Sequence, residues 1–142
     1  MRVCLKGGWG LGLALLLVAT GCNQSNLAKV TGKVTYNDEP VTSGTITFAA
    51  EDKPAAYGDL QPDGSYELQT EKPGDGATPG SYKVFVVAMQ DQGGALPEER
   101  SPLPAPTIPI KYTSLATSDL TAEVEPGKEN VINFNLTGKL GR

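Results

Sequence analysis

Cys22 is the side chain of this sequence whose surroundings point most directly to covalent chemistry. Arg2 and Lys6 form a basic N-terminal region, and an apolar run over residues 7–19 follows them. This run is shorter than an ordinary membrane-spanning helix, but it is typical of a secretory signal. We therefore predict a signal peptide over residues 1–21, cleavage directly before Cys22, and export of the rest of the chain.

The residues around this cleavage point match a known motif. In Val18-Ala19-Thr20-Gly21-Cys22, small residues precede a cysteine. The segment resembles the lipobox of bacterial lipoproteins, in which the cysteine is acylated and becomes the mature N-terminus. The resemblance implies lipidation of Cys22 with palmitate-type chains, and a membrane as partner. Because each buried acyl CH₂ contributes about 0.8 kcal/mol, several chains on one cysteine would anchor the domain durably.

The length of the predicted tether and the charge of the mature chain indicate where the domain lies and which partners it excludes. Residues 22–28 form a predicted tether of at most about 20 Å, so the domain should lie near a lipid surface. We expect the cell membrane or the outer membrane, with the domain facing the periplasm or the exterior. The loss of Arg2 and Lys6 from the 12 basic residues leaves 10 against 16 acidic residues, a net charge of −6. This acidity argues against nucleic acid as a partner.

The sequence contains no histidine. Catalytic triads that use histidine and the usual histidine-containing zinc sites are therefore excluded. Removal of residues 1–21 would also remove Cys4, so that Cys22 would remain as the single thiol and no intramolecular disulfide could form. We predict that the protein is not an enzyme and has no catalytic, cofactor-binding or metal-binding residues.

Three aspartates in glycine-containing loops, Asp59, Asp63 and Asp75, offer an alternative for ligand chemistry. Their carboxylates could bind calcium, but their spacing matches no EF-hand loop. Aspartate in a β-turn normally accepts hydrogen bonds from its own backbone, so we expect turn chemistry at these positions. Gly64 and Gly80 should likewise serve the shape of turns.

The elements that must position these residues are short strands. From residue 29 onward, apolar and polar residues alternate, and clusters of Gly, Pro, Asn and Asp interrupt the pattern about every ten residues. The predicted strands cover residues 30–36, 41–48, 56–60, 65–69, 82–89, 120–124 and 132–136. About seven strands with one apolar face each must pack as two sheets, so the pattern predicts an all-β sandwich over residues 29–137, without a helix.

The connections complete this prediction. The turn at residues 37–40 should join the first two strands as a hairpin, and Asp63-Gly64 should join the third and fourth. The apolar run Val84-Phe85-Val86-Val87 suggests a central strand that is buried on both faces. Five prolines make residues 90–109 a long connection, partly of polyproline type, and residues 138–142 form a tail.

Seven segments of the mature chain match a known pattern. They are Val30-Thr31-Gly32-Lys33-Val34-Thr35-Tyr36, Pro40-Val41, Gly44-Thr45-Ile46-Thr47-Phe48, Asp63-Gly64-Ser65-Tyr66-Glu67-Leu68, Gly80-Ser81-Tyr82-Lys83-Val84, Ile108-Pro109-Ile110-Lys111-Tyr112 and Asn133-Phe134-Asn135-Leu136. Together they resemble the carboxypeptidase regulatory-like domain of single-domain lipoproteins in planctomycete bacteria. The resemblance implies an antiparallel Greek-key sandwich of the transthyretin-like (prealbumin-like) type, exported and lipid-anchored, without an established activity.

Two functions from different classes remain. The first is a lipid-anchored, non-enzymatic module of the cell envelope with an interaction or structural role, whose partner would be an envelope protein or a glycan. The second is a carrier of small ligands or carbohydrate, for which the five tyrosines could supply an aromatic platform. Tyrosines at inward positions of strands favour core packing instead. The prolines of residues 101–109 fit either a docking segment or a stiff crossover.

Overall fold

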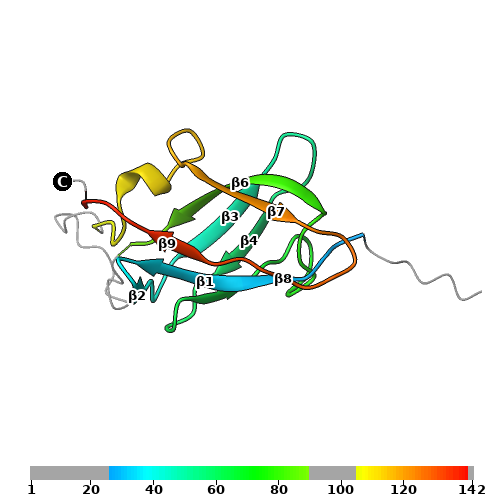
Figure 1. Cartoon of the computed structure of the whole chain (residues 1–142), viewed down its shortest axis with the longest axis horizontal. Coiled ribbons are helices and arrows are strands. Elements are labelled where there is room, and N and C mark those ends of the chain that lie inside the picture. The colour runs from blue at the N-terminus through cyan, green and yellow to red at the C-terminus, as the bar shows by residue number, and fades with distance from the viewer. Residues whose placement is uncertain (1–25, 90–104, 141–142) are drawn as a thin grey trace, which may run out of the picture.

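The computed structural model describes residues 26–89 and 105–140. These residues form two β-sheets that face each other around one hydrophobic core, which confirms the predicted all-β sandwich (Figure 1). The predicted signal peptide over residues 1–21, the predicted lipidation site Cys22 and residues 90–104 of the proline-rich connection lie outside the described residues.

The first sheet contains four antiparallel strands. In spatial order they are β4 (Ala56–Asp59), β3 (Thr45–Ala49), β6 (Gly80–Val87) and β7 (Leu120–Val124). Strand β6 lies between β3 and β7, which confirms its predicted central place. The prediction that β6 is buried on both faces was wrong. Val84 and Val86 are fully buried and Phe85 and Val87 are half-buried, because the second sheet covers only one face of the first.

The second sheet is built around β1 (Val30–Tyr36). The other strands of this sheet are β2 (Glu39–Pro40), β5 (Ser65–Glu67), β8 (Asn130–Val131) and β9 (Phe134–Leu136). Strands β2 and β5 pair with β1 in antiparallel orientation, whereas β8 and β9 pair with it in parallel. These parallel pairs depart from the antiparallel arrangement that the resemblance implied, although most strand pairs of the sandwich are antiparallel. The parallel pairs arise because the chain enters this sheet at Asn130, directly opposite the first residue of β1.

The first predicted hairpin forms only at its turn. Asn37 and Asp38 have positive φ angles of 49° and 70°, as in a type I′ turn. After this turn only Glu39 and Pro40 pair with β1, and the chain then leaves for the first sheet, where β3 pairs with β4 and β6. The predicted pairing of residues 41–48 with the first strand was therefore wrong. Beyond one more bond, from the backbone N–H of Val41 to the carbonyl oxygen of Val34 at 3.0 Å, β5 takes the place beside β1.

The second predicted hairpin is splayed between the two sheets. Tyr57 and Gln69 exchange two backbone hydrogen bonds of 2.9 and 2.8 Å, and the backbone N–H of Gln61 donates to the carbonyl oxygen of Ser65 at 2.8 Å. Between these points β4 pairs with β3 and β5 pairs with β1, so the two strands belong to different sheets. The splayed hairpin closes one long side of the sandwich.

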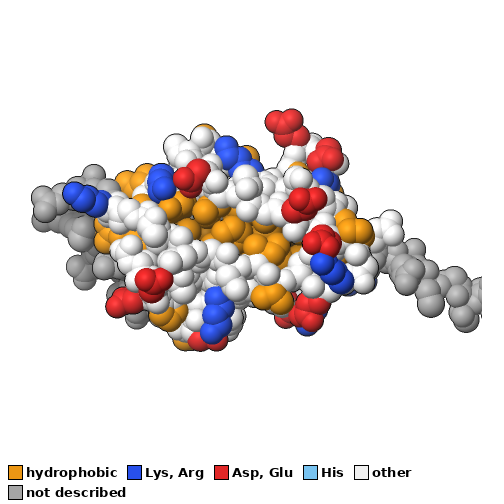
Figure 2. Space-filling model, in the orientation of Figure 1, with side chains coloured by type: hydrophobic (Ala, Val, Ile, Leu, Met, Phe, Trp, Pro, Cys, Tyr) orange, Lys and Arg blue, Asp and Glu red, His pale blue; other side chains and the backbone are white. Residues whose placement is uncertain are grey.

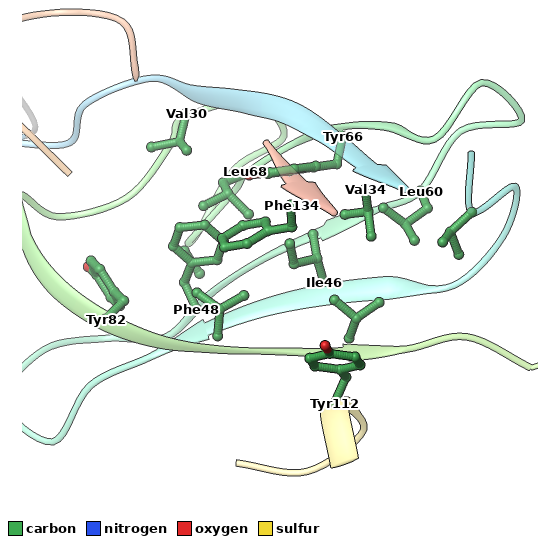
Figure 3. Close-up of a cluster of buried hydrophobic side chains, with 14 of the residues drawn as sticks. Val30, Val34, Ile46, Phe48, Leu60, Tyr66, Leu68, Tyr82, Tyr112 and Phe134 are labelled. Atoms are coloured by element: carbon green, nitrogen blue, oxygen red, sulfur yellow. The ribbon is translucent and has the colours of Figure 1, made fainter. Parts of the chain in front are cut away.

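Phe48 lies at the centre of the core and joins the two sheets (Figure 3). Its ring centroid lies 5.8 Å from that of Tyr82 in the same sheet. From the second sheet, the rings of Tyr66 and Phe134 approach it to 6.3 and 6.1 Å. Full burial of a side chain of this size contributes about 1.5–3 kcal/mol, so apolar packing is the main force that holds the sheets together.

The connection between β6 and β7 is described from residue 105 onward. The backbone N–H of Thr107 donates to the carbonyl oxygen of Ala88 at 3.0 Å, so the chain first continues in extended form beside the end of β6. It then forms the short 3-10 helix η1 (Ile110–Tyr112), which the strand pattern did not predict. The first residue of the predicted tail, Gly138, still contacts the sandwich. Its carbonyl oxygen accepts a hydrogen bond from the hydroxyl of Tyr36 at 2.8 Å.

Candidate functional site

The folded domain begins close to the predicted lipidation site. Cys22 lies outside the described residues, but Ala28 is already buried in the sandwich. Its backbone N–H donates to the carbonyl oxygen of Ala77 at 2.8 Å, and its carbonyl oxygen accepts the N–H of Ala77 at 3.0 Å. The first and last described residues, 26 and 140, lie at opposite ends of the long axis of the sandwich (Figure 1). An anchor on Cys22 would thus hold one defined end of the domain.

The aspartates singled out in the sequence accept hydrogen bonds from neighbouring side chains and backbone. Asp63 accepts from the backbone N–H of Ser65 at 3.0 Å and from its hydroxyl, and these bonds lower the pKa of Asp63. Asp75 organises the loop before β6 by accepting from three backbone N–H groups. Asp59 accepts from the hydroxyl of Thr45 at 3.1 Å. The turn chemistry expected at Asp63 and Asp75 is confirmed.

The turn glycines have the predicted role in shape. Gly64 has a φ of +78°, and a Cβ atom at this position would lie 2.6 Å from the carbonyl oxygen of Val34. Gly80 has a φ of +134°, and its Cβ atom would lie 2.6 Å from Nζ of Lys53. Both conformations are strained for residues that have a side chain.

A polar groove lies along the splayed hairpin. Its volume is about 430 Å³, and its lining residues are Asp59, Gln61, Glu67, Gln69, Pro73 and Gly74. Two carboxylates and two amides thus converge on one surface. Glu67 is also paired with Lys29 at 3.2 Å. The amides were not singled out in the sequence, and Gln69 reaches the groove through its observed pairing with Tyr57.

The tyrosines divide between the core and the surface. Tyr66, Tyr82 and Tyr112 are buried and Tyr36 is half-buried, so core packing accounts for most of the predicted aromatic platform. Tyr57 differs because it is 43% exposed. It lies on the same face of β4 as Asp59 and directly opposite Gln69, and both of these residues line the polar groove.

A second group of titratable side chains surrounds η1. Nζ of Lys111 lies 4.3 Å from the ring centroid of Tyr112 and 3.4 Å from Oδ2 of Asp119. Burial raises the pKa of Tyr112, but the Lys111 ammonium and hydrogen bonds with Thr137 outweigh burial and leave it below its ordinary value. The hydroxyl donates to the carbonyl oxygen of Thr137, so the group links two segments of the chain.

The long side opposite the splayed hairpin is open. Its edges are β7 in the first sheet and β8 and β9 in the second. Figure 2 shows hydrophobic side chains in a stripe along the middle of this face, in the region where Figure 1 places these edges. Exposed hydrophobic surface bordered by polar residues is typical of interaction sites.

The comparisons with known proteins leave the family open. No family model matches the chain, and no curated protein matches it in sequence. Within residues 26–89 and 105–140, no helix has the length and apolar character needed to cross a membrane. The same residues contain no group of three or more His, Cys, Asp or Glu side chains that could hold a metal ion.

Proposed function

We propose that this chain is a lipid-anchored, non-enzymatic module of the bacterial cell envelope that binds another envelope component. The observation that carries the proposal is the short connection between Cys22 and the sandwich, which begins at Ala28. An extended chain of this length spans about 20 Å, so an acylated Cys22 would keep the domain beside the membrane. The carboxypeptidase regulatory-like resemblance belongs to the same proposal, and the two-sheet fold supports it.

The shape of the domain supports a binding role in this position. The sandwich is longest along the direction from the start of β1 to the C-terminus (Figure 1). With the N-terminal end at the membrane, the opposite end points away from it. The open side between β7 and β9 extends along the same direction, and thus stays accessible to a partner in the envelope.

Intact mass spectrometry tests the anchor directly. The full-length chain is expressed in a bacterial host, extracted in mild detergent and weighed. We expect a chain that begins at Cys22 and carries the mass of two or three acyl chains. Cys22→Ser should abolish the added mass and release the protein from membranes, whereas Cys4→Ser should change neither result. An unmodified mass for the wild-type chain would overturn the proposed anchor.

The polar groove favours a second function, a carrier of carbohydrate. Carboxylates and amides that converge beside an exposed tyrosine can bind sugar hydroxyls and the apolar face of a sugar ring. In this role Asp59 and Gln69 would accept and donate hydrogen bonds, and Tyr57 would stack on the ring. The groove volume of about 430 Å³ lies in the usual range for small-ligand sites.

A glycan array separates this function from the first. A carrier should bind a defined class of glycan, and both Tyr57→Ala and Gln69→Ala should remove that binding. Leu115→Ala, at an exposed position outside the groove, serves as the matched control and should leave binding unchanged. Equal signals from all three variants, or no binding by the wild-type protein, would eliminate the carbohydrate function.

A further inference from the structure

The two long sides of the sandwich differ in their backbone pairing. On one side, hydrogen bonds of the splayed hairpin join the sheets. On the other side, the described residues give β7 a single neighbour, β6, and give β8 and β9 a single neighbour, β1. A strand edge without a second neighbour presents N–H and C=O groups that can pair with another chain.

Partly exposed hydrophobic side chains lie between these two edges. Leu120 and Ala122 of β7, and Ile132 between β8 and β9, are half-buried and pack against the core. We call these three residues the seam. On the neighbouring strand β6, by contrast, the inward residues Tyr82 and Val84 are almost fully buried. The seam is therefore the uncovered margin of the core.

Hydrogen bonds hold the two ends of the seam. At one end, the Asn130 side chain accepts from the backbone N–H of Glu125 at 2.9 Å and donates to its carbonyl oxygen at 3.0 Å, joining the end of β7 to β8. At the other end, the hydroxyl of Tyr112 bonds Thr137, joining the connection before β7 to the end of β9. Between these two points the unpaired edge of β7 is about 17 Å long.

The edge of β7 is better suited to pairing than the edge of β8 and β9. Residues 132 and 133 separate β8 from β9 without a change of register, and the Asn133 side chain there accepts the backbone N–H of Lys33 at 2.9 Å. Strands of two and three residues with a break between them give a short, interrupted edge, which disfavours the addition of a further strand. Strand β7 has no such interruption, because five consecutive residues pair with β6.

The outward face of β7 and its flanks is acidic. Asp119, Thr121, Glu123 and Glu125 alternate with the inward residues. Asp119 is paired with Lys111 and Glu125 with Lys128, whereas the described residues provide no ion-pair partner for Glu123. Strand β7 itself contains no basic residue. A complementary strand would therefore have basic residues on its outward face.

We propose that the edge of β7 binds an extended segment of another envelope protein in which Lys or Arg alternates with apolar residues. The backbone of this segment would add a strand to the four-stranded sheet. Its apolar side chains would cover the seam, and its basic side chains would lie beside Glu123. The inference rests on the proposed interaction role and gives the chemistry of the partner.

A second copy of the chain does not fit this edge. When two antiparallel strands extend one sheet, residues that face each other lie on the same face of it. In two copies of β7, Asp119 and Glu125 would then lie opposite acidic residues or Thr121 of the other copy. Like charges in such positions are destabilising, so the acidic face selects against pairing of β7 with itself.

Fluorescence polarisation with a defined peptide tests the proposal. The probe is a labelled peptide in which lysine and valine alternate over about seven residues, and the protein is the full-length chain extracted in mild detergent. We expect saturable binding that a peptide of the same composition, with lysines and valines in separate blocks, does not show. N-methylation of the alternate amides that face β7 should abolish binding, whereas N-methylation of the amides on the other edge should preserve it.

Charge variants and sedimentation complete the test. Glu123→Lys should lower the affinity for the lysine–valine peptide by about threefold. Glu39→Lys, an equal charge change on β2, should leave this affinity unchanged. Equal binding of the alternating and block peptides, or a dimer in sedimentation that excludes the peptide, would overturn the proposal. An unmodified mass for Cys22 would count against the anchor alone, so the two failures are distinguishable.

Discussion

The hydroxyl of Tyr112 bonds both backbone groups of Thr137, since it lies 3.1 Å from the carbonyl oxygen and 3.3 Å from the nitrogen. The hydroxyl donates one bond and accepts the other, and the ring is buried. Tyr112 belongs to the connection that leads into the first sheet, whereas Thr137 directly follows β9 in the second sheet. One side chain therefore couples the two sheets at one end of the open side.

Removal of this hydroxyl should weaken the sandwich without unfolding it. Tyr112→Phe keeps the buried ring but leaves two backbone groups without their partner, which should lower the free energy of unfolding by about 1–2 kcal/mol. Tyr57→Phe is the matched control, because Tyr57 is 43% exposed. Urea denaturation measures both variants, and an equal loss of stability would contradict the role assigned to the Tyr112 hydroxyl.

Alternation in the sequence predicted the strands better than their partners. The limits of β1 and the position of β7 follow from the period of two and from flanking turn residues, and both are found in the structure. Alternation shows which residues face the core, but it does not show which strand lies alongside. The chain changes sheet after Pro40 and again between β7 and β8, so local hairpins could not predict the pairing.

The same limit applies to the candidate site. The bonds of Asp63 with Ser65 are local and could be predicted from turn chemistry. The bond between Tyr112 and Thr137 spans 25 positions of the sequence. It depends on two segments that meet only after the sheets have packed, and the seam beside it depends on the same meeting. Sequence reasoning could therefore not predict the open side.

Asn130 should be the most sensitive polar position of the open side. Its buried amide accepts from the N–H of Glu125 and donates to the carbonyl oxygens of Glu125 and Lys128. Asn130→Ala leaves these groups without partners, and we expect a loss of about 2–3 kcal/mol in the free energy of unfolding. Thermal and urea denaturation would measure it. Glu129→Ala, at the exposed neighbouring position, should cost less than about 0.5 kcal/mol.

Asn130→Asp tests the two N–H donors of the Asn130 amide separately from its oxygen acceptor. The substitution keeps an oxygen for the N–H of Glu125, but it points a carboxylate at the carbonyl oxygens of Glu125 and Lys128. These contacts should raise the pKa of the introduced carboxyl in the folded state. Relative to the wild type, the variant should therefore gain stability as the pH falls through that raised pKa. A constant difference between the two proteins from pH 7 to about pH 4 would contradict this account.

Gly32 allows β1 to lie close to the segment between β8 and β9. A Cβ atom at this position would lie 1.8 Å from the carbonyl oxygen of Ile132, which also accepts the hydroxyl of Tyr66 at 2.7 Å. Gly32→Ala should therefore push the strands apart and cost about 3 kcal/mol in the free energy of unfolding. Gly127→Ala is the control, since no atom lies within 4 Å of the added Cβ and only its positive φ of +74° should cost stability, by about 1–2 kcal/mol. Equal losses in urea denaturation would show that the close approach has no energetic weight.

Asp75 should contribute stability that depends on pH. Burial raises the pKa of Asp75, but hydrogen bonds from the backbone N–H groups of Thr70, Lys72 and Glu71 outweigh it, so the pKa lies below its ordinary value of 3.8. The donor distances are 2.6, 2.9 and 3.0 Å. A carboxyl whose pKa is depressed by folding stabilises the folded state above the unfolded pKa, and this contribution is lost as the pH falls through the folded value.

Asp75→Asn should therefore remove a pH-dependent part of the stability. At neutral pH the variant should unfold at a lower urea concentration than the wild type, because an amide accepts the three N–H groups less well than a carboxylate. Below about pH 4 the two unfolding curves should converge as Asp75 becomes protonated in the wild type. Glu71→Gln, which removes an exposed carboxylate from the same loop, is the control for the loss of one negative charge. If the offset between Asp75→Asn and the wild type stays constant with pH, the three backbone bonds do not favour the ionised form of Asp75.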